Sequence, residues 1–181
     1  MFELKIDSFY KAHELMDAKW PTKSISLIAP DEDRCFNRGM NHLLLRFDDS
    51  DIENDEEMFQ SIKGWRQVQS PRKQQVAIAL AFTKDLKDGD RLLVHCTAGK
   101  SRSTAIGIAA LIQHGMTPQE AFDHVKALRP ALIPNRLIIQ YVDELLELNG
   151  ELNKVIEEYY NSLLLDSKLP LLLLRRHKIE K

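Results

Sequence analysis

The sequence predicts an α/β sandwich, and three observations lead to this expectation. Three segments are apolar on successive positions, as in strands covered by helices on both faces: residues 25–29, 42–47 and 91–94. Helical patterns lie between and after these segments. The 181 residues, 44% of them hydrophobic, suffice for one domain with a proper core, or for one domain with a helical extension.

In chain order, residues 9–16 place apolar side chains on one face of a short helix, which ends at Trp20 and Pro21. Pro30 and the charged residues 31–33 end the first strand. Ser70 and Pro71 mark the start of a helix that runs to about residue 87. This helix is expected to bury four apolar side chains, those of Val76, Ile78, Leu80 and Phe82.

The later helices have clear boundary signals. The helix that follows the third strand is expected to end near His114, with Gly115 after it. A capping box with proline at the first helical position starts the next helix at residues 117–120. Asn135 is expected to cap a further helix and to serve mainly as a helix-entry device. Residues 151–165 form an amphipathic stretch.

Composition excludes several classes of protein. The net charge of −2 argues against a general nucleic-acid or membrane-surface binder. No apolar run follows a basic start at the N-terminus, so no signal peptide is expected. The longest leucine run, residues 171–174, is far shorter than the roughly 20 residues that span a bilayer. With two cysteines, Cys35 and Cys96, a reducing, cytoplasmic setting is the simplest expectation.

Residues 95–103 carry the strongest chemical signal in the chain. The third strand turns there directly into an apolar helix, so the first N–H groups of that helix lack backbone partners and form an anion site. Cys96 stands at this site, which lowers its pKa and favours the nucleophilic thiolate. Gly99 allows φ > 0, so successive amides point inward. Arg102 offers a planar fork for two phosphate oxygens, and Ser103 is placed to donate to the sulfur.

The pattern His-Cys-x-x-Gly-x-x-Arg-Ser at residues 95–103 resembles the phosphate-binding loop of cysteine-dependent protein tyrosine phosphatases, most of all their compact, dual-specificity branch. Residues 129–135, followed by Gln140, resemble a second segment of that family. The resemblance implies a protein tyrosine phosphatase-like fold with a central, mostly parallel sheet flanked by helices. It also implies a phosphatase domain at residues 1–150, leaving residues 151–181 as a C-terminal helical extension that packs on the same domain or on a partner.

The resemblance further implies an aspartic acid that protonates the leaving oxygen, on the loop after the strand that precedes the catalytic one. Residues 47–51 occupy this place. Asp49 is preferred because it takes the position that the family's acid usually holds, with Asp48 second and Asp51 third. An acidic, solvated loop without a catalytic member remains the alternative.

Other roles also follow from the resemblance. The substrate-binding loop would comprise Thr97, Ala98, Gly99, Lys100, Ser101 and Arg102. His95 would order this loop and support the thiolate. Some phosphoinositide phosphatases carry lysine at the position of Lys100, but a lysine alone does not establish lipid specificity. Cys35 either traps Cys96 as a disulfide under oxidation or is a buried free thiol.

These residues predict a phosphatase that works through a cysteinyl-phosphate, with Cys96, Arg102, Asp49 and Ser103 as the catalytic set and with no metal or cofactor. The expected substrate is phosphotyrosine on protein, with phosphoserine or phosphothreonine as further substrates. The alternatives are a phosphoinositide or other small phosphoester phosphatase, a phosphate-binding module without turnover, and a rhodanese-like sulfurtransferase. No nucleic acid and no membrane span are expected.

Overall fold

The computed structural model describes residues 1–33, 41–53 and 68–166. Their strands form one four-stranded sheet in the order β1-β4-β2-β3, and every neighbouring pair is parallel. The bounds of these strands are β1 Glu3–Ser8, β2 Lys23–Ile28, β3 His42–Arg46 and β4 Arg91–Cys96. The predicted parallel sheet flanked by helices is therefore confirmed.

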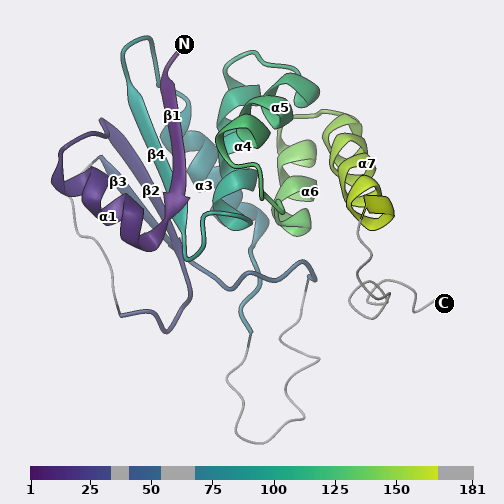
Figure 1. Cartoon of the computed structure of the whole chain (residues 1–181), viewed down its shortest axis with the longest axis horizontal. Helices are drawn as coiled ribbons and strands as arrows, with labels where there is room; N and C mark the ends of the chain where they lie inside the picture. Colours follow the sequence, from purple (N-terminus) through teal and green to yellow (C-terminus); the bar gives the residue numbers. More distant parts are fainter. Residues whose placement is uncertain (34–40, 54–67, 167–181) are drawn as a thin grey trace, which may run out of the picture.

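Two layers of helices cover the sheet (Figure 1). Helix α1, Phe9–Asp17, lies on one face and buries Phe9, Ala12 and Met16 against Leu93 of β4. On the other side lie α3 Lys73–Thr83, α4 Arg102–Gln113, α5 Pro118–Leu128, α6 Arg136–Leu145 and α7 Glu151–Asp166. Of these, α3 and α4 contact the strands, and α5, α6 and α7 pack on them and on one another. Helix α4 is buried along almost its whole length, so it is the central helix of this larger layer.

Strand β1 is a difference from the sequence-based expectation, which places no strand before residue 25. Leu4 and Ile6 are each 4% exposed and face the main core, whereas Glu3 on the alternate side is exposed. β1 is an edge strand with a short apolar face, so its pattern lacks the continuous apolar run of the central strands. It pairs with β4 along its whole length, which places Ser8 beside Cys96.

Two expected burial patterns are wrong in detail. In α3, Val76 and Leu80 are buried as predicted, but Ile78 is 43% exposed, and Ala79 and Thr83 complete the buried face. Residues 76, 79, 80 and 83 share one helix face at the spacing of an α-helix, and position 78 lies off that face. In α1, Tyr10 is 72% exposed instead of sharing a buried face with Phe9.

The predicted helix boundaries after β4 are confirmed. Helix α4 ends at Gln113, and Gly115 follows it with φ 98°. Thr117 and Glu120 form the capping box of α5, and the Asn135 side chain accepts a hydrogen bond from the Ile138 amide at the start of α6. These capping signals depend on residues within about one helical turn, so they set the helix boundaries without tertiary contacts.

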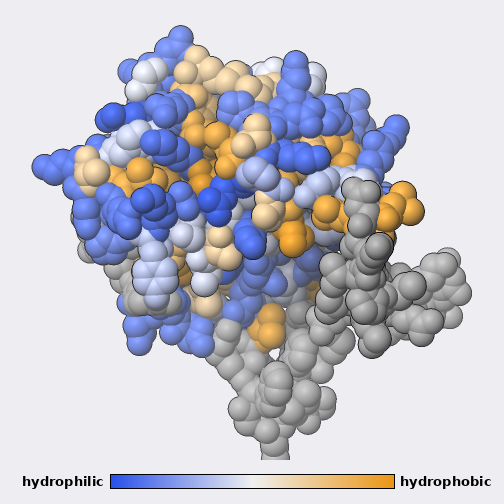
Figure 2. Space-filling model, viewed as in Figure 1, coloured by the Kyte–Doolittle hydropathy of each residue, from blue (hydrophilic) through white to orange (hydrophobic). Residues whose placement is uncertain are grey.

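Helix α7 shares the main core with the rest of the chain, since Leu152, Ile156 and Tyr159 are buried members of it. Its last turns expose three leucines, Leu163, Leu164 and Leu165, and Figure 2 shows hydrophobic atoms at this end of the helix beside the grey segment. The domain boundary at residue 150 stays a prediction. In the described part of the chain, no helix has both the length and the apolar character needed to cross a membrane.

Candidate active site

The candidate site lies at the carboxyl end of β4, where the chain turns into α4. Cys96 ends the strand and Arg102 begins the helix, so residues 97–101 form the connecting loop. The Cys96 sulfur accepts from the Gly99 amide at 3.2 Å, and the Ser103 Oγ lies 3.2 Å away on the other side. Cys96 is a free cysteine and is 2% exposed.

The surroundings of this sulfur favour the thiolate. Burial opposes ionisation and by itself raises the pKa of Cys96. The hydrogen bonds from the Ser103 side chain and backbone, the positive charge of Arg102 and the Gly99 amide act in the other direction and outweigh burial. The pKa of Cys96 is therefore lower than that of an ordinary thiol, as a nucleophilic cysteine requires.

Arg102 lies almost wholly inside the protein, at 5% exposure. Its Nη1 donates to the Phe47 carbonyl at 2.7 Å, and its Nη2 donates to the Thr97 hydroxyl at 3.1 Å. The buried Nε has no hydrogen-bond partner among the described residues, and Asp49 Oδ2 lies 4.0 Å from it. Because a buried cationic N–H without a partner is costly, this nitrogen is well suited to an incoming anion.

Two features of the structure require glycine at position 99. Its φ of 69° is left-handed, as the sequence predicts, and turns its amide toward the sulfur. A Cβ at this residue would also lie 2.4 Å from the Asp7 carbonyl carbon. The end of β1 therefore supports the back of the loop at a distance that only glycine allows.

The end of β1 and Arg129 hold the loop from outside, a role that the sequence pattern predicts for neither of them. Arg129 Nε donates to the Gly99 carbonyl at 3.1 Å, while its Nη1 lies 3.3 Å from Asp7 Oδ1. Its Nη2 donates to the Ala98 carbonyl at 3.3 Å, and the Phe9 amide donates to the Thr97 carbonyl at 3.2 Å. Arg129 stands in the second family-like segment, which is the one signal that pointed to it.

Of the three candidate aspartates, Asp49 is the one that contacts the loop. Its Oδ1 accepts from the Ser101 hydroxyl at 2.6 Å and from Asn135 Nδ2 at 3.0 Å. Asp48 instead accepts from the Gln69 amide at 2.8 Å, and Asp51 accepts from the Arg136 amide at 2.7 Å at the start of α6. Asp49 therefore lies beside the loop, while Asp48 and Asp51 accept from backbone amides of other segments.

His95 is fully buried on the α1 side of the sheet. Burial lowers its pKa to about 4, with the charges of His42 and Arg102 in the same direction and a hydrogen bond with the Cys96 backbone against it. Its Nε2 lies 2.5 Å from Ser26 Oγ, which in turn lies 3.3 Å from His42 Nε2. His95 is therefore neutral at neutral pH, and it can order the loop by hydrogen bonding but not by charge.

The outer edge of the loop is open to solvent. Thr97, Ala98 and Lys100 are exposed, whereas Ser101 is half-buried. The Lys100 carbonyl accepts from the Ile133 amide at 2.8 Å, which joins this edge to the segment before α6. Lys100 thus adds a positive charge at the mouth of the site.

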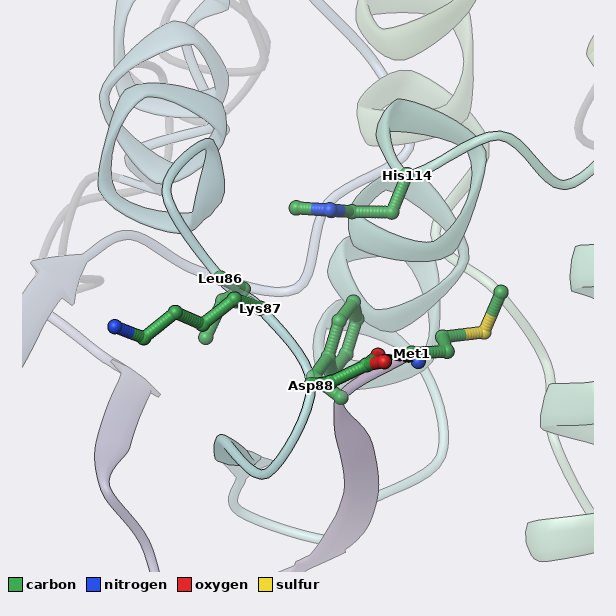
Figure 3. Close-up of a pocket in the computed structure, with 6 residues that line it drawn as sticks. Met1, Leu86, Lys87, Asp88 and His114 are labelled. Atoms are coloured by element: carbon green, nitrogen blue, oxygen red, sulfur yellow. Dashed lines mark hydrogen bonds and ion pairs between the residues drawn. The ribbon is translucent and has the colours of Figure 1, made fainter.

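A separate pocket, shown in Figure 3, lies at the opposite end of the sheet. It has a volume of about 330 Å³ and is lined by Met1, Phe2, Leu86, Lys87, Asp88 and His114. None of the predicted site residues lines it, so it is distinct from the candidate site.

Cys35 lies outside the described residues. Within residues 1–33, 41–53 and 68–166, no cluster of three or more His, Cys, Asp or Glu side chains is arranged to hold a metal ion.

A thiol of lowered pKa ends a strand of the parallel sheet, and after a short loop the next helix begins with a buried arginine. This arrangement is typical of cysteine-based phosphatases of protein tyrosine phosphatase type. The family model described as "Dual specificity phosphatase, catalytic domain" matches residues 48–149. The chain therefore belongs to the dual specificity phosphatase family.

Individual proteins are similar to this chain either over short segments of higher identity or over most of the chain at low identity. Dual specificity protein phosphatase 1 of Arabidopsis thaliana is 45% identical over 60 residues, which cover 33% of this chain and 30% of that protein. Phosphatidylglycerophosphate phosphatase PTPMT1 of the same plant is 46% identical over 46 residues, 25% of this chain and 14% of that protein. The chain thus spans less than a third of either relative. The crystal structure of human DUSP28 matches with a TM-score of 0.51 at 20% identity, over 88% of this chain and 94% of that one, which shows the shared fold.

The Ser103→Ala variant tests whether Ser103 stabilises the thiolate. It removes the hydroxyl that is hydrogen-bonded to the Cys96 sulfur, and a hydrogen bond to a charged group contributes about 1.5–3 kcal/mol. The pKa of Cys96 is expected to rise, so the acidic limb of the kcat/KM profile moves to higher pH, and kcat at neutral pH falls by about 10-fold. A pH profile of hydrolysis, with iodoacetamide alkylation of Cys96 as a direct titration, measures both effects. An unchanged acidic limb would contradict the assigned role.

Proposed function

We propose that this chain is a protein phosphatase that removes phosphate from phosphotyrosine through a cysteinyl-phosphate intermediate, and that it also accepts phosphoserine or phosphothreonine. The observation that carries the proposal is the pairing of the Cys96 sulfur, held by Ser103 and the Gly99 amide, with the buried guanidinium of Arg102, whose Nε donates no hydrogen bond to any described residue. One group supplies the nucleophile and the other receives the charge of the phosphoryl oxygens.

The reaction runs in two balanced steps. The Cys96 thiolate forms an S–P bond as the P–O bond to the leaving group breaks, and protonated Asp49 gives its proton to the departing oxygen. Asp49 then takes a proton from water, whose oxygen forms a P–O bond as the S–P bond breaks. Ser103 stabilises the departing thiolate, and Arg102 with the loop amides stabilises the phosphoryl oxygens throughout.

Asn135 and Ser101 would hold Asp49 for this purpose. Both donate to Oδ1 of its carboxyl group, which leaves Oδ2 to carry the proton to the leaving oxygen. The reaction needs a reduced Cys96, and this requirement supports a cytoplasmic setting for the protein.

A second candidate is a phosphatase of phosphoinositides or other phospholipids. Exposed Lys100 supports it by adding charge at the mouth of the site. The similarity to a phosphatidylglycerophosphate phosphatase also favours it, although over a short range. Protein phosphotyrosine is preferred because the family match spans the larger part of the chain.

Hydrolysis of p-nitrophenyl phosphate, with and without orthovanadate, tests the activity, and a panel of phosphopeptides and phosphoinositides tests the substrate class. We expect vanadate-sensitive turnover, with kcat/KM highest for phosphotyrosine peptides. Higher kcat/KM for phosphoinositides would favour the second candidate. Binding of phosphopeptides without turnover would contradict both phosphatase candidates and indicate a recognition module. Sulfur transfer from thiosulfate to cyanide would indicate a sulfurtransferase.

A further inference from the structure

Helix α7 lies outside the segment that matches the phosphatase family, yet its tyrosines contact the chain that supports the acid loop. The family match ends at residue 149, and α7 begins at Glu151. Tyr159 Oη donates to the Leu132 carbonyl at 3.0 Å, and Tyr160 Oη donates to the Pro134 carbonyl at 2.9 Å. Both acceptors belong to the short segment between α5 and α6.

This segment holds the loop of Asp49 directly. Asn135, the residue after Pro134, donates through Nδ2 to Asp49 Oδ1 at 3.0 Å and to the Ser50 carbonyl at 2.9 Å. Its Oδ1 accepts from the Ile138 amide at 2.9 Å, so the same amide group joins the start of α6 to the acid loop. A displacement of Pro134 would therefore be passed to Asp49 through one side chain.

Tyr160 also contacts this region through its ring. The Arg136 guanidinium lies 4.1 Å from the ring centroid, and the Arg136 amide donates to Asp51 Oδ1 at 2.7 Å. Burial raises the pKa of Tyr160, and the negative charges of Asp51 and Asp49 raise it further, against a smaller opposite effect of Arg136. The hydroxyl thus stays protonated and remains a donor to the Pro134 carbonyl.

Helix α7 is well anchored for a supporting role. The buried Asp143 carboxylate of α6 accepts from the amides of Gly150, Leu152 and Asn153 at 2.7, 2.9 and 3.1 Å, which satisfies the first turn of α7. Leu152 and Ile156 then pack into the main core. The helix is fixed at its start, so its tyrosines can fix the segment that they contact.

We propose that Tyr160, with Tyr159 in a lesser part, is a positioning residue for Asp49, acting through the backbone of residues 132–134 and the Asn135 side chain. The inference rests on the proposed function, because it assigns Asp49 the role of acid. It makes α7 part of the catalytic unit, although the helix contributes no group to the reaction itself.

The test compares two substrates that depend differently on the acid. Tyr160→Phe removes the hydroxyl and keeps the ring on Arg136, so the fold is expected to survive. Phenyl phosphate has a poor leaving group, so its hydrolysis needs a well-placed acid. The leaving group of p-nitrophenyl phosphate is much better, so its hydrolysis needs the acid much less. We expect kcat/KM to fall on the order of 10-fold for phenyl phosphate and by less than about 2-fold for p-nitrophenyl phosphate.

Controls separate positioning from general destabilisation. Ser162→Ala removes a hydroxyl of the same helix that donates to the Tyr159 carbonyl at 2.8 Å, and it is expected to leave both kcat/KM values unchanged. Tyr160→Phe should also have little effect in an Asp49→Asn background, since the group that it positions is then gone. Equal losses on both substrates, no loss on either, or an undiminished loss in the Asp49→Asn background would each overturn the proposal.

A second measurement keeps the proposal testable if the wild-type chain shows no turnover and the proposed function fails. Hydrogen–deuterium exchange in Tyr160→Phe should then be faster at residues 132–139 and 48–53 and unchanged at α4. Such a pattern would support the mechanical link between α7 and the loop of Asp49. Unchanged exchange at residues 48–53 would overturn it.

Discussion

Replacing Cys96 with serine is expected to lower phosphatase turnover on the order of 10⁴-fold or more, because a serine hydroxyl at this position has no general base to activate it. The pKa of Cys96 is already lowered by its surroundings, whereas no comparable shift brings a serine hydroxyl into the neutral range. Hydrolysis of p-nitrophenyl phosphate by the purified variant measures the loss.

Phosphate binding is the control for this prediction. Arg102 and the loop amides remain in Cys96→Ser, so a phosphotyrosine peptide should bind with an affinity close to that of the wild-type chain, as measured by calorimetry. Substantial residual turnover would contradict the thiolate mechanism. Lost binding together with a normal melting temperature would show that the sulfur itself is needed to form the anion site.

Replacing Asp49 with asparagine is expected to lower kcat/KM by about 10²–10⁴-fold for phenyl phosphate, since general acid catalysis typically contributes that much. The asparagine oxygen can still accept from Ser101 and Asn135, so the loop should keep its conformation. Steady-state kinetics with phenyl phosphate measures the loss.

The neighbouring aspartates supply matched controls. Asp48→Asn and Asp51→Asn each keep an acceptor for the amide that they bind, those of Gln69 and Arg136 respectively. Both variants should retain kcat/KM within a few-fold of the wild-type value. A large loss in Asp48→Asn with a normal Asp49→Asn would transfer the role to Asp48, contrary to the geometry.

The sequence was most informative where structure is local. The capping signals at Thr117 and Asn135 predict the starts of α5 and α6, because a cap depends on residues within one turn of the chain. The strands β2, β3 and β4 were found because their apolar runs are continuous. Strand β1 was missed, since its short alternation is recognisable only once β4 lies beside it.

Within the candidate site, the geometry around Cys96 was predictable and that around Asp49 was only partly so. Cys96, Gly99 and Ser103 lie within eight consecutive residues, so one strand–loop–helix turn brings them together. Asn135 was expected mainly as a helix cap, and the structure gives it that role along with the contact to Asp49. The second contact depends on how α6 packs against α3 and α4, which no local pattern encodes.

By itself, the sequence determined the class of fold, the candidate loop around Cys96 and the run of aspartates proposed to supply the acid, because each depends on residue types at short, regular spacing. The tertiary structure alone decided which aspartate faces the loop, that Asp7 and Arg129 hold it from behind, that Ser26 bonds to His95, and that Tyr160 contacts the segment beside Asp49. These contacts join residues far apart in the chain, and strand register and helix packing set them only when the whole core has formed.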